Sequence, residues 1–122
     1  MDGKKFRLIY YKQEDGFVPM EDFLDSLEPK LQAKALRDLA VLQAKAELLR
    51  EPMTKPLGKG LFELRLRQSN DIARMIFFFR PERTIVVTHG FVKKSNKTPR
   101  REIERALRYK ADWKRRHPCG RP

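Results

Sequence analysis

The chain has 122 residues, which suits one domain with a single modest core. Hydrophobic residues make up 40% and charged residues 36% of it, and this composition excludes disorder throughout. The single cysteine, Cys119, excludes an internal disulfide and indicates a reducing compartment. We see no secretion signal and no apolar run near the roughly 20 residues of a membrane helix. We therefore expect a cytoplasmic protein with no membrane partner.

The formal net charge of +12 lies in one part of the sequence. Residues 1–50 contain nine Lys/Arg and nine Asp/Glu, whereas residues 51–122 contain nineteen Lys/Arg and seven Asp/Glu. Clustered cations gain free energy by displacing the counterions of a nucleic acid. The asymmetry therefore favours a polyanionic partner over the alternative, a solubilising surface with a charged tail.

The first half of the chain predicts one strand and two helices. Phe6–Lys12 is rich in aromatic and aliphatic residues and indicates a strand. Pro19–Leu27 predicts a short helix, and Pro29 suits the first turn of a longer one that runs to about Arg50. Apolar residues recur at threes and fours along the longer helix. We expect the two helices to form a hairpin over the sheet.

The second half predicts a loop over Met53–Gly60, followed by three strands. The strands are Leu61–Gln68, Ile72–Arg80 and Thr84–Val92. Their connections are short and rich in turn-forming residues, so we expect an antiparallel meander.

A last helix is predicted from Pro99 to about Trp113, with Thr98 as its N-cap. Residues 1–113 then form one domain, and residues 114–122 a flexible basic tail. The fold class is α+β: a small, twisted, mainly antiparallel sheet with the helical hairpin on one face and a C-terminal helix. We expect the helices over one face and the other face open to a ligand.

Three arginines are expected on the open face of the sheet. Side chains alternate along a strand, so Arg65 and Arg67 point away from the apolar residues between them. Arg74 faces the same way from the next strand. One acid, Glu63, can pair with one of them across the strands, but three arginines favour a phosphate site over simple pairing.

His89 stands near the end of the last strand and has two readings. Its ordinary pKa of about 6.5 suits a general base. It also shares a predicted face with Ile85 and Val87, which favours a buried, hydrogen-bonded structural histidine. After it, a dense group of cations spans the loop and the start of the last helix, where free backbone N–H groups also attract phosphate. The group is Lys93, Lys94, Lys97, Arg100 and Arg101.

No metal-ligand spacing, phosphate-binding loop or serine nucleophile motif occurs, so we expect no metal and no cofactor. Two-metal cleavage needs several convergent carboxylates, and the acids here are scattered. A phosphodiester would therefore be cut by the substrate's own 2′-hydroxyl. That reaction needs a proton acceptor, a proton donor and cations around the transition state. A lysine can take part in these proton transfers only if its pKa is lowered, and neighbouring cations lower it.

Four segments together resemble the HigB toxins, in the phage-derived branch of the RelE/ParE superfamily. They are Gly60–Arg65, Arg74–Phe79, His89–Lys94 and Lys97–Pro99. The resemblance covers essentially the whole chain and implies the RelE-like fold. It also implies the toxin of a type II toxin–antitoxin system, a ribosome-dependent, metal-independent endoribonuclease that cleaves messenger RNA and so inhibits translation. The implied partners are messenger RNA, the ribosome and a cognate antitoxin, commonly a helix-turn-helix protein.

The resemblance also implies roles for individual residues. Arg65 and Arg67 fall where RelE-type toxins carry basic residues, and Arg74 matches a position that contacts the scissile phosphate. Lys94 matches a basic residue just after the fourth strand. We therefore take Arg65, Arg74, Lys93 and Lys94 as catalytic, and Arg67, Lys97, Thr98, Arg100 and Arg101 as RNA-binding.

The chain departs from the RelE pattern at the start of the last helix, where the family has a tyrosine. In this last helix the first tyrosine is Tyr109, well after its start, so the identity of the general base stays open. Two alternatives to the nuclease also stay open: a ParE-like inhibitor of DNA gyrase, and a non-catalytic module that binds RNA or the ribosome.

Overall fold

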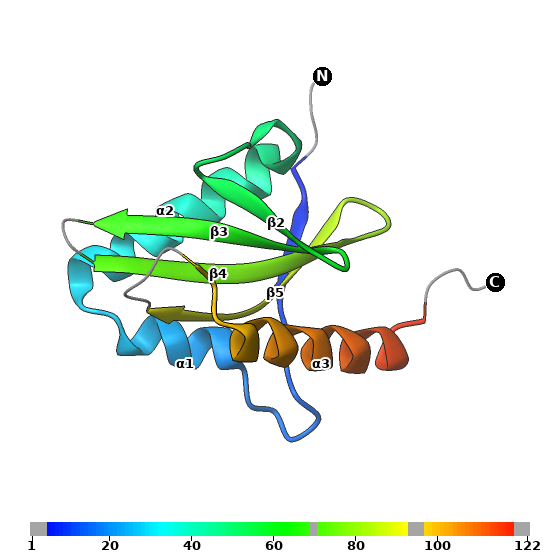
Figure 1. Cartoon of the computed structure of the whole chain (residues 1–122). Helices are drawn as coiled ribbons and strands as arrows, with labels where there is room; N and C mark the ends of the chain where they lie inside the picture. Colours follow the sequence, from blue (N-terminus) through cyan, green and yellow to red (C-terminus); the bar gives the residue numbers. More distant parts are fainter. Residues whose placement is uncertain (1–4, 69–70, 93–96, 119–122) are drawn as a thin grey trace.

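The computed structural model describes residues 5–68, 71–92 and 97–118. Five strands and three α-helices follow one another along these residues (Figure 1). In chain order they are β1 (Arg7–Tyr10), α1 (Pro19–Ser26), α2 (Pro29–Lys45), a short 3₁₀ helix η1 (Ala46–Leu48), β2 (Thr54–Gly58), β3 (Leu61–Gln68), β4 (Asp71–Arg80), β5 (Thr84–Val92) and α3 (Arg100–Arg116).

The five strands form one mixed sheet in the order β1-β5-β4-β3-β2. β2, β3, β4 and β5 are joined as antiparallel neighbours, and β1 lies parallel to β5 at the far edge. The α+β class predicted from the sequence, with a mainly antiparallel sheet, is confirmed.

One face of the sheet packs against α1 and α2. Glu28 caps α2 by accepting hydrogen bonds from the backbone N–H groups of Lys30 and Leu31, and Pro29 occupies the first turn. The apolar stripe of α2 then meets the inner side of β3 and β4, where Leu64, Met75 and Phe77 are buried. Burying each such side chain contributes about 1.5–3 kcal/mol, so this layer forms the main core.

The opposite face is covered by α3, which corrects the expectation that this face stays open (Figure 1). Ala106 of α3 is fully buried against Ile76 and Phe78, and Trp113 packs beside them. The end of the helix is tied to the segment after β1, because Tyr11 donates to the carboxylate of Asp112 and Arg116 donates to the carbonyl of Lys12, both at 2.6 Å. Only part of this face is therefore left for a ligand.

The segment predicted as a loop contains β2, which is a second correction. β2 pairs with β3 as the edge strand, with Pro56 opposite Phe62 and a register irregularity before Gly58. Proline is accepted on an edge strand because one side of it needs no partner. The same Pro and Gly residues that indicate a loop thus also suit an irregular edge.

The helix ends also differ from the predicted ones. α2 ends at Lys45 and gives way to η1, which covers the rest of the range predicted up to about Arg50. α3 begins at Arg100 after an N-cap at Pro99, and it continues to Arg116, past the predicted boundary at 113. Thr98 does not cap the helix, because its hydroxyl donates to Glu63 instead.

A β-bulge in β5 decides which way His89 faces. Ile76 pairs with His89, whereas the next residue of β4, Phe77, pairs with Val87, so Thr88 is an extra residue. The side chain of His89 therefore lies on the α3 face beside Tyr109, not on the face of Ile85 and Val87 as the alternation predicted. Among the described residues, no helix is long and apolar enough to cross a membrane.

Candidate functional site

Two rows of side chains cross the α3 face of the sheet near the start of that helix. Glu63, Ile76 and His89 stand opposite one another on β3, β4 and β5. The next row holds Arg65, Arg74 and Phe91. The sheet register thus brings Glu63 beside both arginines.

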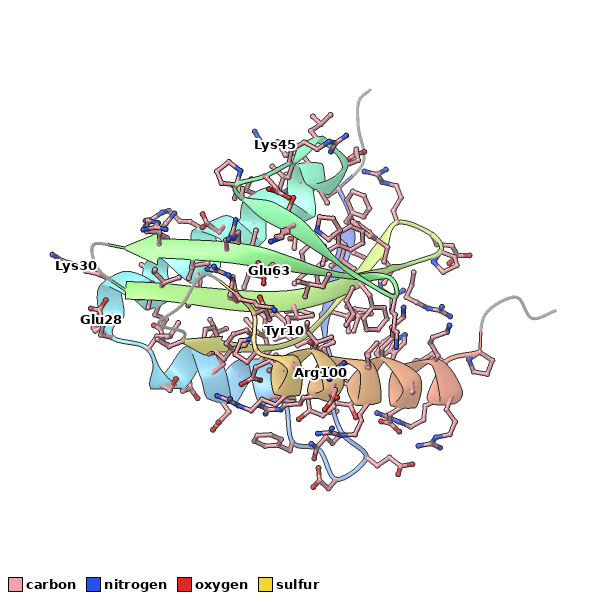
Figure 2. All side chains as sticks on the ribbon, viewed as in Figure 1. Tyr10, Glu28, Lys30, Lys45, Glu63 and Arg100 are labelled. Carbon is pink, nitrogen blue, oxygen red and sulfur yellow. The ribbon has the colours of Figure 1, made fainter. Side chains whose placement is uncertain are left out.

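Glu63 is a buried carboxylate, only 1% exposed, at the centre of this group. Its Oε2 atom lies 3.3 Å from Nε of Arg74 and 3.4 Å from Nε of Arg65. Its Oε1 atom accepts a hydrogen bond from the hydroxyl of Thr98, just before α3. Figure 2 labels Glu63 on the sheet and Arg100 at the start of that helix. The carboxylate therefore joins two arginines of the sheet to the entry of α3. From the sequence, Glu63 was expected to pair with only one arginine.

Arg74 is buried, with 3% of its surface exposed, which corrects the expectation of an open position. Burial lowers the pKa of its guanidinium and nearby Arg65 and Arg67 lower it further, while Glu63 acts in the opposite direction. Because the ordinary pKa of arginine is far above neutral, the group keeps its charge. Among the described residues its Nε has no hydrogen bond of good geometry. Arg74 is a charge held inside the fold by Glu63.

A pocket of about 360 Å³ opens beside these arginines. Arg65, Arg67 and Arg74 line it from the sheet, and Lys34 and Asp38 line it from α2. Asp38 is paired with Lys34 at 3.1 Å, so one of the four cations has an acid partner inside the pocket. The excess of positive charge suits a phosphate group. Lys34 was not among the residues predicted for the site. The one signal in the sequence was its spacing, one helical turn before Asp38.

His89 is held by hydrogen bonds at both ring nitrogens. Nδ1 lies 3.1 Å from the hydroxyl of Thr88, and Nε2 lies 2.9 Å from a carboxylate oxygen of Glu102. Burial lowers the pKa of His89 to about 4, against the opposing hydrogen bond to Glu102. The ring is fully buried and neither nitrogen faces solvent, which favours the structural reading over that of a general base.

The other predicted residues divide into three groups. Arg67, Lys97, Arg100 and Arg101 are exposed, and the last two lie on the first turn of α3 with side chains 91% and 82% exposed. Thr98 is buried against Glu63 and is not at the surface. Lys93 and Lys94 lie outside the described residues. Within the described ranges, no three His, Cys, Asp or Glu side chains form a group that could hold a metal ion.

Comparison with known proteins agrees with the pattern read from the sequence. Residues 22–111 match the model of a family described as phage derived protein Gp49-like (DUF891). Two curated proteins of Mycobacterium tuberculosis, from strains CDC 1551 / Oshkosh and ATCC 25618 / H37Rv, are each 36% identical over 61 residues. Both bear the name "Probable endoribonuclease HigB1". The match covers 50% of this chain and 48% of each relative, so the chain spans about half the length of the curated relatives it matches.

Proposed function

The chain belongs to the phage-derived Gp49-like family, and from this premise we propose that it is the toxin of a type II toxin–antitoxin system. We propose that it is an endoribonuclease that cleaves messenger RNA on the ribosome, without a metal, and so inhibits translation. Its place of action is then the cytoplasm, and its partners are messenger RNA, the ribosome and an antitoxin, which we take to be a helix-turn-helix protein. The name of the curated relatives supports the endoribonuclease activity.

The observation that carries the proposal is the convergence of Arg65, Arg67 and Arg74 on one pocket. Two of these arginines are anchored by a buried carboxylate, so their positions are fixed before any ligand arrives. Preorganised cations stabilise developing charge better than mobile ones, because they need not reorient during the reaction. This suits the extra negative charge of a phosphodiester under attack.

The proposed reaction uses the 2′-hydroxyl of the substrate as the nucleophile. The 2′-oxygen bonds to phosphorus and loses its proton, while the bond to the 5′-oxygen breaks and that oxygen gains a proton. Arg65 and Arg67 would bind the phosphate oxygens, and Arg74 would add charge from within the fold. Lys93 and Lys94 stay candidates for the proton transfers, since the group of cations around them would depress a lysine pKa.

The exposed cations at the start of α3 would bind ribosomal RNA. Lys97, Arg100 and Arg101 lie beside the free N–H groups of the first helical turn, which add to the attraction for phosphate. Binding to RNA through these groups should weaken steeply with salt, by about 0.7–0.9 units of log K per phosphate contact.

The test is a translation reaction with purified protein, read as new 5′ ends in the translated message. Arg67→Ala should lower the cleavage rate by about 10²–10³, as removal of a positioned charge typically does, because this exposed arginine can be lost without harm to the core. Arg37→Ala, which removes an exposed arginine of α2 outside the pocket, is the matched control.

Equal cleavage by wild type and Arg67→Ala would exclude the arginine pocket as the active site. The products should end in 2′,3′-cyclic phosphate, and 3′-hydroxyl ends would exclude attack by the 2′-hydroxyl. A parallel reaction with supercoiled DNA and gyrase tests the ParE-like alternative: gyrase-dependent DNA breaks without cleavage of messenger RNA would replace the proposed function. Ribosome binding without either activity would leave only the binding module.

A further inference from the structure

The outer edge of β1 is an unpaired sheet edge. β1 stands at the end of the strand order, and among the described residues no strand lies on its outer side. The backbone N–H groups of Arg7 and Tyr11 donate toward β5, to the carbonyls of Arg83 and Val87. Because backbone groups alternate along a strand, Leu8 and Tyr10 direct their N–H and C=O groups outward. Such an edge is a template for another strand.

A groove of about 1020 Å³ runs along this edge and is larger than the arginine pocket. Its floor includes Ile9 and Tyr10 of β1. The end of α3, with Trp113, forms one wall, and the start of α1, with Val18, lies on the other side. The turn between β4 and β5 closes one end, and Figure 1 shows these elements around the strand.

The groove carries an excess of positive charge. Arg7, Lys12 and Arg80 line it, and none of the three has an ion-pair partner among the described residues. Arg116 also lines it but is held by Asp112 and by the carbonyl of Lys12. The acids of the lining are Glu21 and Glu82. The charge therefore favours an acidic occupant.

Apolar side chains stand between these cations. Ile9, Val18 and Trp113 are half-buried, so each keeps apolar surface exposed to the groove. An edge strand offers carbonyl acceptors as well as N–H donors. A peptide backbone pairs with both kinds of group, whereas a phosphodiester can use only the donors. The combination of apolar, cationic and backbone groups thus fits a peptide better than RNA.

We propose that this groove binds an extended acidic segment of a partner protein, which adds to the sheet as a strand beside β1. The segment would place apolar side chains against Ile9 and Trp113 and carboxylates near Arg7 and Arg80. This site is separate from the arginine pocket, because Arg74 and Arg80 are six residues apart on β4, about 20 Å along a strand. The proposal stands independently of the nuclease function.

The test uses the full chain and a synthetic peptide of about eight residues that repeats Glu-Ser-Val-Ser, so that glutamate and valine follow one another on the same face of a strand, with a length that exceeds the span of β1. Trp113 is the only tryptophan of the chain and lines the groove, so its fluorescence reports occupancy. We expect a saturable change with the glutamate peptide. Two control peptides should not bind: one with lysine in place of glutamate, and one N-methylated at every residue, which keeps the charge but lacks the N–H donors.

Reversing the groove charge should weaken binding of the glutamate peptide. Arg7→Glu combined with Arg80→Glu should raise Kd about tenfold or more, whereas Arg37→Glu on the exposed side of α2 should leave it unchanged. Circular dichroism confirms that each variant is folded. The proposal is overturned if the glutamate peptide does not bind, or if the N-methylated or lysine peptide binds equally well. It is also overturned if an oligouridylate binds more tightly and the double variant abolishes that binding, since the groove would then be an RNA surface.

Discussion

The two faces of the sheet are built on different principles. Beneath α1 and α2 the packed cluster is apolar, from Leu31 and Leu42 on the helix to Met75 and Phe77 on the strand. Beneath α3 an apolar cluster continues, but buried polar side chains lie beside it near the helix start. They are Glu63, Arg74, His89 and Thr98.

The difference shows where stability and function are separated. Apolar burial is favourable wherever it occurs, whereas a buried charge is costly unless a partner meets it. Glu63 and Arg74 meet each other on the face that also carries the exposed cations at the start of α3. The α1/α2 face therefore stabilises the fold, and the α3 face uses part of that stability to hold charged groups in place. This division leads to four predictions.

The largest effect is expected from Glu63→Ala. It leaves Arg74 buried without its carboxylate, so we expect a loss of about 3–5 kcal/mol in the free energy of unfolding, measured by chemical denaturation. Glu63→Leu combined with Arg74→Met should be much less destabilised than Glu63→Ala, because no charge stays unpaired. A loss below about 1 kcal/mol for Glu63→Ala would mean that solvent reaches Arg74, so that the Glu63–Arg74 pair behaves as an exposed one.

Leu42→Ala tests the opposite face. Leu42 is fully buried on α2, so the cavity should cost about 2–5 kcal/mol. Cleavage of messenger RNA should stay at the wild-type rate at temperatures where the variant is folded, because Leu42 does not line the arginine pocket. A strong loss of activity in the folded variant would show that the two faces are not functionally separate.

Gly90→Ala should have a smaller effect, of about 1–3 kcal/mol, from overpacking. A Cβ atom at this position would lie 2.5 Å from the ring of Phe23, so α1 would have to move. Adding Phe23→Leu to Gly90→Ala removes the ring atoms that the new Cβ meets. The double variant should therefore recover part of the stability lost in Gly90→Ala. Thermal unfolding of the two variants measures this. No recovery would mean that the clash is relieved elsewhere.

The smallest effect concerns pH and His89. Its pKa in the folded state is lowered to about 4, so the unfolded chain takes up the proton first as the pH falls below about 6.5. This contribution to stability is therefore present above that value and is lost progressively between about pH 6.5 and pH 4, with about 1.4 kcal/mol lost at pH 5.5. The groups facing the ring are Thr88 on β5 and Glu102, Arg105, Arg108 and Tyr109 on α3.

His89→Gln should flatten the pH dependence in this window, measured by chemical denaturation at successive pH values. Glutamine keeps hydrogen-bonding groups but cannot be protonated there. A variant with the same slope as wild type would assign the loss of stability to other groups.

The sequence predicted the elements well where local signals agreed with the final packing. The periodicity of α2 and the alternation in β3 and β4 gave the correct faces for Leu64, Met75 and Phe77. These residues pack on the side that their own neighbours indicate, so no distant information was needed.

The remaining features depend on contacts between distant segments. Arg74 was predicted to be exposed, because the pattern of β4 alone does not indicate that its guanidinium lies against the buried Glu63 of β3. The importance of Glu63 arises from its pairing with Thr98, which is 35 residues away. β2 was missed because its Pro and Gly residues are typical of loops as well as of irregular edges.

The bulge at Thr88 makes β5 two half-strands that alternate out of phase. Thr88 therefore lies outside the regular ladder. Val87 and His89 already pair with neighbouring residues of β4, Phe77 and Ile76, so deletion of Thr88 would leave a regular strand with His89 still on the α3 face and Gly90 still against Phe23. The deletion would remove the hydroxyl that donates to the carbonyl of Ile76 and lies 3.1 Å from Nδ1 of His89. Sequence variation among relatives should accordingly include both exchanges and a one-residue gap at this position, because neither changes which side chains face α1 and which face α3.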